Sequence, residues 1–127
     1  MKFLKKYFDN KPLNNVRILN LTIRYVDKDI NAFIKYAKQD VYAFVFYYRI
    51  SKDFGDIELQ NIHMDLSDEA IRLNGTFYLP YRHHYNKYQL LTAYPEIKKF
   101  IILKKKYDSL NIFCNLWYDF VLDILKK

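Results

Sequence analysis

The spacing of apolar and polar residues predicts two β-strands in the first half of the chain. Residues 16–26 alternate strictly, which is typical of a strand with one solvated face. The apolar residues expected to share a face there are Leu19, Leu21, Ile23 and Tyr25. Residues 41–50 (VYAFVFYYRI) are apolar at nearly every position, which predicts a buried central strand.

Elsewhere the apolar residues recur every three or four positions, which predicts amphipathic helices. The helices expected in this way cover residues 3–8, 30–37, 59–73, 87–94, 96–107 and 113–124. Gly75 is expected to end the 59–73 helix in a left-handed conformation. Residues 76–81 (TFYLPY) read as a short strand that stops near Pro80, because proline cannot donate a ladder hydrogen bond. Together these elements predict an α+β fold, with a small antiparallel sheet and helices packed on one side.

Composition supports one folded domain over residues 1–127, since about half of the residues are apolar and Gly and Pro are scarce. The 13 Tyr and 10 Phe favour strands. The net charge of +7 is compatible with nucleic acid, an anionic membrane or an acidic partner. The lysines fall mostly on expected solvated helix faces, and no nucleic-acid-binding signature is present, so we expect no nucleic acid. The basic surface permits peripheral membrane contact.

Other compositional features exclude several classes of site. The single cysteine, Cys114, cannot form an internal disulfide, and we expect it to be an inert buried thiol. No His/Cys spacing suggests a metal site, and His63 is expected to be structural or to lie on the surface. No apolar stretch is long enough to span a bilayer, and the first residues lack a signal-peptide pattern. A cytoplasmic or peripheral-membrane location is therefore the expectation.

Polar aromatic and imidazole side chains concentrate between residues 76 and 88 and form the candidate site. Those singled out are Tyr78, Tyr81, Arg82, His83, His84, Tyr85 and Tyr88. Tyr and His combine a flat apolar body with a hydrogen-bonding tip, which suits a sugar-like substrate. The alternative is that the tyrosines pack in the core and the histidines are solvated.

Several short motifs follow one another in a recognisable order in residues 73–120. They are Gly75, the YLPY segment at 78–81, His84, Gln89, Tyr94-Pro95, Phe100, Leu103-Lys104, Lys106-Tyr107-Asp108, Phe113, Asn115 and Trp117. Their order resembles the C-terminal part of FAD-linked oxidases of the vanillyl-alcohol-oxidase-like group, which include D-arabinono-1,4-lactone oxidases. Residues 18–48 are similar to a strand, helix and strand of the cap domain in the same proteins. Ser109 departs from the family pattern, which has proline there.

This resemblance implies a partial cap domain that forms the substrate-side wall over the flavin of a sugar-lactone or polyol oxidase. The family's FAD-binding domain, which binds most of the cofactor, is absent from this sequence, so a separate FAD-binding chain is the implied partner. Tyr81 and His84 are the first-ranked candidates for lining the substrate pocket, and Tyr78 and Arg82 are the further candidates. His84 is the candidate catalytic base, and no cofactor-binding residue is assigned.

Two other interpretations remain open from the residues. One is a stand-alone basic binding protein that neutralises a toxin or binds nucleic acid, and the other is a non-functional remnant. The fragment interpretation predicts an unpaired sheet edge and exposed apolar area, and therefore poor solubility of the chain alone.

Overall fold

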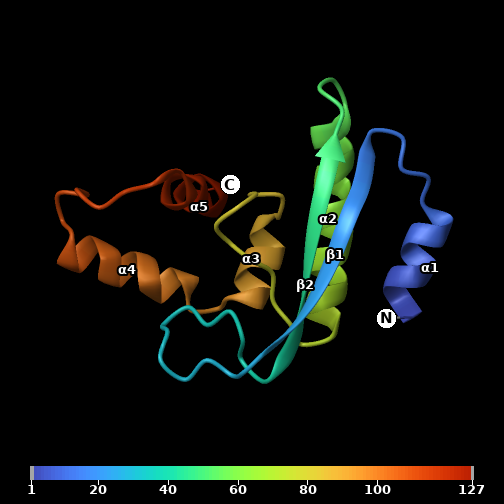
Figure 1. The fold of residues 1–127 in the computed structure, drawn as a ribbon. Helices are drawn as coiled ribbons and strands as arrows, with labels where there is room; N and C mark the ends of the chain where they lie inside the picture. Colours follow the sequence, from blue (N-terminus) through green and yellow to red (C-terminus); the bar gives the residue numbers. More distant parts are fainter. Residues whose placement is uncertain (1, 127) are drawn as a thin grey trace.

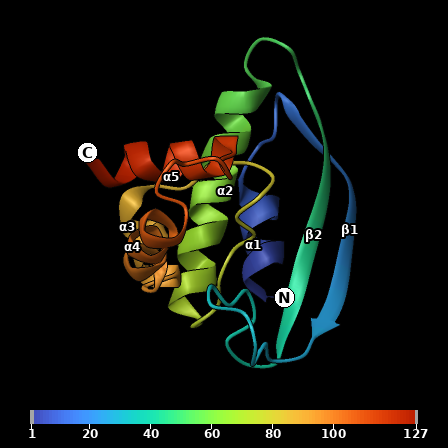
Figure 2. The same ribbon diagram turned by 90° about the vertical axis from the view of Figure 1, so that its left-hand side faces the viewer.

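A computed structural model describes residues 2–126, in which five helices accompany a two-stranded antiparallel sheet (Figure 1). The helices lie on one side of the strands, as the view in Figure 2 shows, which confirms the predicted α+β arrangement. In chain order the elements are α1 (Lys2–Asn10), β1 (Val16–Val26), β2 (Val41–Ile50), α2 (Gly55–Arg72), α3 (Lys87–Ala93), α4 (Ile97–Tyr107) and α5 (Leu116–Lys126).

A register shift in β1 modifies the expected alternation. The pairing passes from Ile18 opposite Tyr48 to Asn20 opposite Tyr47, so Leu19 is left unpaired as a bulge. Residues on either side of the bulge share the inner face, of which α1 and α2 cover one part: Val16, Ile18, Leu21, Ile23 and Tyr25. The prediction that Leu19 belongs to this face was therefore wrong, because one extra residue reverses the alternation at that point.

The prediction that residues 41–50 form a buried central strand was also wrong. β2 has only β1 as a neighbour among the described residues, and each of its two faces carries exposed apolar side chains. Tyr42 on the inner face is 66% exposed, and Tyr47 on the outer face is 68% exposed. An apolar run typical of a central strand thus lies at a sheet edge.

The helix predicted for residues 30–37 does not form, and 27–40 is an irregular connection. The Asp29 carboxylate accepts hydrogen bonds from the backbone N–H groups of Asn31 and Ala32, both at 2.9 Å. The Asp29 N–H in turn donates to the Ala37 carbonyl at 2.8 Å, which closes a loop instead of a helical turn. Ala37 is buried, and Ile34 packs against buried residues of α3, α4 and α5, so tertiary packing prevails over the helical spacing.

Residues 73–86 form an irregular segment, and the strand predicted at 76–81 is not formed. The Thr76 hydroxyl donates to the Tyr36 carbonyl, and the Tyr94 hydroxyl donates to the Phe77 carbonyl. These side chains take the place of a neighbouring strand. Asn74, with φ of 57°, adopts the left-handed conformation predicted for Gly75.

Gly75 is needed for a different reason. Its N–H donates to the Ala70 carbonyl at 2.7 Å, and an added Cβ would lie 3.0 Å from that oxygen. The glycine therefore permits a close approach at the end of α2.

The buried side chains form two separate clusters. The sheet cluster joins α2 to the strands through Leu59, Ile62 and Val16. The helical cluster brings α3, α4, α5 and the 73–86 segment together, and consists of Leu79, Tyr85, Leu90, Ala93, Tyr94, Ile97, Ile101, Tyr118 and Val121.

Gln89 attaches the helical cluster to α2. Its buried amide donates to the Met64 carbonyl at 2.9 Å and to Asp68 at 2.7 Å. Its carbonyl oxygen accepts from the Asn86 N–H, which completes a capping box at the start of α3. A single polar side chain therefore both begins α3 and fixes it against α2.

Candidate functional site

The structure brings two histidines together where the 73–86 segment runs beside α2. The His63 and His84 rings meet edge to face, with centroids 5.3 Å apart, and Tyr48 of β2 lies 5.7 Å from His63. Asp56, at the start of α2, and Arg82 complete the group. We call Tyr48, Asp56, His63, Arg82 and His84 the histidine cluster.

An ion pair fixes the polar end of the histidine cluster. The Arg82 Nη1 lies 2.6 Å from the Asp56 Oδ1. The same carboxylate oxygen is 3.6 Å from the His84 Nε2, which is too long for a hydrogen bond. Asp56 therefore contributes charge near His84 while its hydrogen-bonding capacity is directed at Arg82.

Two polar atoms in the histidine cluster are buried and have no hydrogen-bond partner within residues 2–126: the His84 Nε2 and the Tyr48 hydroxyl. Burying such a group without a partner costs about 1–3 kcal/mol. Outside the cluster, the His83 Nε2 and the Glu96 Oε2 are buried without a partner as well. Such atoms require an explanation, and a bound ligand is one.

Burial controls the protonation of both imidazoles. Desolvation lowers the pKa of His63 to about 4, with further lowering from His84 and Arg82. Burial also lowers the pKa of His84, although Asp56 opposes this effect. Both rings are therefore neutral near pH 7.

The two candidate tyrosines form a separate aromatic group with Tyr36. The rings of Tyr78 and Tyr81 are 4.9 Å apart, and Tyr36 meets Tyr78 edge to face at 5.7 Å. On a regular strand Tyr78 and Tyr81 would point to opposite faces, but the irregular backbone allows them to contact. Tyr81 is 84% exposed, so this group lies at the surface.

Two further residues of the candidate region, His83 and Tyr85, pack on the helical cluster, whereas Tyr88 is exposed. The His83 ring stacks on Phe120 with centroids 4.8 Å apart. The Tyr85 hydroxyl accepts a hydrogen bond from the Trp117 Nε1 at 3.0 Å, and burial raises the pKa of Tyr85 to about 12. These residues serve packing, which was the alternative interpretation of the tyrosines. The structure thus divides the candidate region into a histidine cluster, a surface tyrosine group and core side chains.

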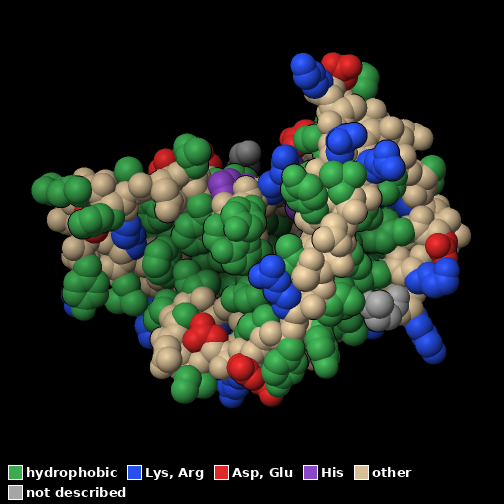
Figure 3. Space-filling view, viewed as in Figure 1, with side chains coloured by type: hydrophobic (Ala, Val, Ile, Leu, Met, Phe, Trp, Pro, Cys, Tyr) green, Lys and Arg blue, Asp and Glu red, His purple; other side chains and the backbone are tan. Residues whose placement is uncertain are grey.

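Hydrophobic side chains gather across the centre of the face shown in Figure 3, between the strands and helices α4 and α5. Exposed apolar residues also continue into the connection before α5, at Leu110, Ile112 and Phe113. Cys114 lies in the same connection and is exposed, so the prediction of a buried thiol was wrong. The connection extends away from the helical cluster and leaves the thiol uncovered.

The chemistry available to the histidine cluster is hydrogen bonding and proton transfer. A neutral imidazole beside an Arg–Asp pair can orient a substrate hydroxyl and accept its proton. Within residues 2–126 no three His, Cys, Asp or Glu side chains come together as a metal site. In the same range no helix has the length and apolarity needed to cross a bilayer.

Sequence reasoning identified Arg82 and His84 but missed Tyr48, Asp56 and His63. Asp56 and His63 are seven residues apart on α2, which places them two turns apart on one face. The helical period could therefore have predicted that these two residues share a face. Tyr48 gave no comparable signal, because β2 is aromatic along its length.

Comparisons with family models, with curated proteins and with solved structures find no match to this chain.

Proposed function

We propose that this chain is the substrate-side part of a flavin-dependent oxidoreductase that acts on a sugar lactone or polyol, and that it works with a separate FAD-binding chain. The ordered motifs in 73–120 and 18–48 support the family. The observation that carries the proposal of a partner is the incomplete sheet beside the histidine cluster.

The sheet has the features of a surface that another chain covers. Both strands are ten residues or longer, and neither outer edge is paired within residues 2–126. Such edges present unpaired N–H and C=O groups that favour strand addition. The apolar side chains exposed on the two faces, beyond the reach of α1 and α2, are Ile23, Tyr25, Tyr42, Phe44, Val45 and Tyr47. Exposed apolar patches of this kind mark interaction sites in soluble proteins.

The residues present fit the substrate side of a flavin site. The His84 Nε2 and the Tyr48 hydroxyl are unpartnered, and the exposed ring of Phe44 is an apolar surface on the same face of the sheet as Tyr48. A bound flavin accepts the hydride of an alcohol oxidation, which protein side chains cannot do. His84 accepts the proton of the substrate hydroxyl in this proposal, and Arg82 and Tyr81 orient the sugar-like substrate through hydrogen bonds.

Purification of a co-expressed complex tests the proposal. The tagged chain would be produced with the product of the neighbouring upstream reading frame, and the absorbance spectrum of the purified material recorded. We expect co-purification and flavin bands, followed by oxidation of a sugar lactone or polyol. A His84→Asn variant should keep the flavin bands and lose kcat, whereas Tyr88→Phe, an exposed change outside the histidine cluster, should leave both unchanged.

A colourless product with no second chain would contradict the proposal. The variant Val45→Lys tests the partner surface separately, because it adds a charge to the exposed sheet. This variant should lose the second chain and the flavin together, while Leu110→Lys, at a still more exposed apolar position away from the sheet, should retain both.

A second candidate is a stand-alone binding protein for an anionic partner. It is favoured by the outer face of the sheet, where Arg17, Arg24 and Arg49 form no ion pair within residues 2–126. It predicts binding that weakens steeply with salt and needs no flavin. The co-expression experiment separates the two candidates, because only the first gives a coloured complex.

A further inference from the structure

The sheet register sets two arginines directly against each other. Arg17 of β1 pairs with Arg49 of β2, so both side chains project from the outer face. Like charges directly opposite each other on one face destabilise a strand pair. Within residues 2–126 neither guanidinium has an acidic partner at ion-pair distance. The two guanidinium groups therefore lie on the same face of the sheet, and no acidic side chain among the described residues neutralises them.

An acidic residue near this end of the sheet, Glu58 of α2, is engaged in other hydrogen bonds. The Glu58 carboxylate accepts hydrogen bonds from the N–H groups of Asn14 and Asn15, at 3.0 and 2.9 Å. It also accepts from the Asn15 Nδ2 at 3.1 Å. Glu58 thus fixes the turn that leads into β1 and does not contact the arginines.

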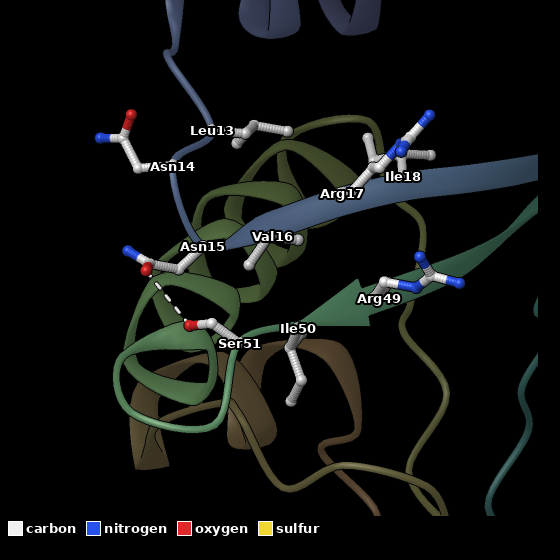
Figure 4. A pocket seen from close by; sticks show the side chains of 9 residues that line it. All are labelled: Leu13, Asn14, Asn15, Val16, Arg17, Ile18, Arg49, Ile50 and Ser51. Carbon is white, nitrogen blue, oxygen red and sulfur yellow. Dashed lines mark hydrogen bonds between the residues drawn. The ribbon is translucent and has the colours of Figure 1, made fainter.

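A hollow of about 650 Å³ lies at this end of the strands, and both arginines line it (Figure 4). Its polar walls include Asn14, Asn15 and Ser51. The Ser51 hydroxyl donates to the Asn15 Oδ1 at 3.1 Å, the dashed bond in Figure 4, and this bond links the start of β1 to the end of β2. In the same figure Arg17 and Arg49 extend toward the same side of the sheet. The space is large enough for a small anion and its first water molecules.

We propose that Arg17 and Arg49 bind a doubly charged phosphate group. Each guanidinium offers a planar fork of N–H donors that matches phosphate oxygens, and two of them balance two negative charges. Binding would also remove the repulsion between the opposed arginines, so the anion stabilises the strand pair. The inference does not rest on the flavin proposal, because it concerns the opposite face of the sheet from the histidine cluster.

Titration of the full chain with inorganic phosphate tests the site. Calorimetry at constant ionic strength should give saturable binding of one phosphate, and thermal unfolding should shift upward with phosphate but not with chloride. Arg17→Gln or Arg49→Gln should weaken phosphate binding about tenfold or more, since hydrogen bonds between charged groups are lost. Without phosphate, each of these variants should unfold at the same temperature as the wild type or a few degrees higher, because the repulsion is gone.

Arg24→Gln is the matched control, because Arg24 lies on the same face of the same strand but opposite Ala43. It makes the same charge change and should retain wild-type phosphate affinity. Loss of binding in Arg24→Gln equal to that in Arg17→Gln would overturn the site in favour of a diffuse basic surface. Arg49→Lys keeps the charge but loses the fork, so wild-type affinity in that variant would overturn it as well.

A phosphate monoester such as glycerol 2-phosphate identifies the source of the group. Tighter binding of the ester than of inorganic phosphate would assign the site to a phosphorylated small molecule, and equal binding would assign it to free phosphate. Absence of saturable binding for both compounds would overturn the proposal. None of these results depends on flavin content, so failure here and failure of the proposed function are distinguishable.

Discussion

The helical cluster and the sheet cluster use similar apolar residues but are enclosed to different degrees. The helical cluster holds nine buried residues, and α3, α4, α5 and the 73–86 segment surround it. The sheet cluster holds three, namely Val16, Leu59 and Ile62, and beyond them the strands carry exposed Tyr, Phe and Val side chains. The helical half therefore encloses a larger core than the sheet half, although both halves also expose large apolar side chains.

The largest effect should come from truncating matched leucines in the two clusters. Leu90 in the helical cluster is 0% exposed and Leu59 in the sheet cluster is 1% exposed. We expect Leu90→Ala to lower the free energy of unfolding by about 4 kcal/mol and Leu59→Ala by about 2 kcal/mol, because an open-sided site collapses more easily around a cavity. Urea denaturation would measure both.

The exposed residue Leu116 is the control for this pair, and Leu116→Ala should change stability by less than about 0.5 kcal/mol. A larger loss for Leu59→Ala than for Leu90→Ala would show that the sheet half is the better enclosed one.

Acid should destabilise the sheet half first, through His63. Its pKa is about 4 in the folded chain and about 6.5 when unfolded, so the unfolded chain binds more protons between these values. Stability should therefore fall as the pH is lowered through this window, by roughly 2 kcal/mol once partial solvent access is considered. Urea titrations at pH 7.5 and pH 5 would measure part of this loss.

The variant His63→Gln removes the titrating group and should show a smaller difference between pH 7.5 and pH 5. The lowered pKa values of carboxylates such as Asp65 and Asp108 act below this window. Equal acid sensitivity in the wild type and the variant would contradict the assignment to His63.

Two tyrosine hydroxyls sharpen the comparison further, since one lies in each half. The Tyr48 hydroxyl is buried without a partner, so Tyr48→Phe should stabilise the chain by about 1 kcal/mol. The Tyr85 hydroxyl accepts the Trp117 N–H, so Tyr85→Phe should destabilise it by about 1 kcal/mol. Thermal and urea unfolding of the two variants would show the opposite signs. A loss in both would mean that the Tyr48 hydroxyl has a partner in solution.

The smallest effect on stability, with a clear effect on association, is expected on the exposed sheet. Val45→Lys should change the free energy of unfolding by less than about 0.5 kcal/mol and reduce self-association of the isolated chain. Analytical ultracentrifugation over a range of concentrations would measure this. Leu110→Lys, at an exposed position away from the strands, should have less effect. Equal effects would assign self-association to general apolar exposure.

Local patterns determined most of the secondary structure of this protein. The strands at 16–26 and 41–50 and the helices around 59–73, 87–94, 96–107 and 113–124 were predictable, because their periods of two or 3.6 come from the backbone geometry itself. The polar and aromatic composition of residues 76–88 also singled out Arg82 and His84 as candidate site residues.

Only the tertiary structure decided how these elements are covered. The 27–40 connection and the 76–81 segment lose their predicted regular structure because packing of Ala37 and hydrogen bonds from Thr76 and Tyr94 outweigh weak local preferences. The sequence of β2 is that of a strand covered on both faces, whereas the structure supplies cover for part of one face. Likewise, His63 meets His84 and Arg17 meets Arg49 across elements distant in sequence, and pairings of that kind depend on strand register and helix packing, which no local pattern specifies.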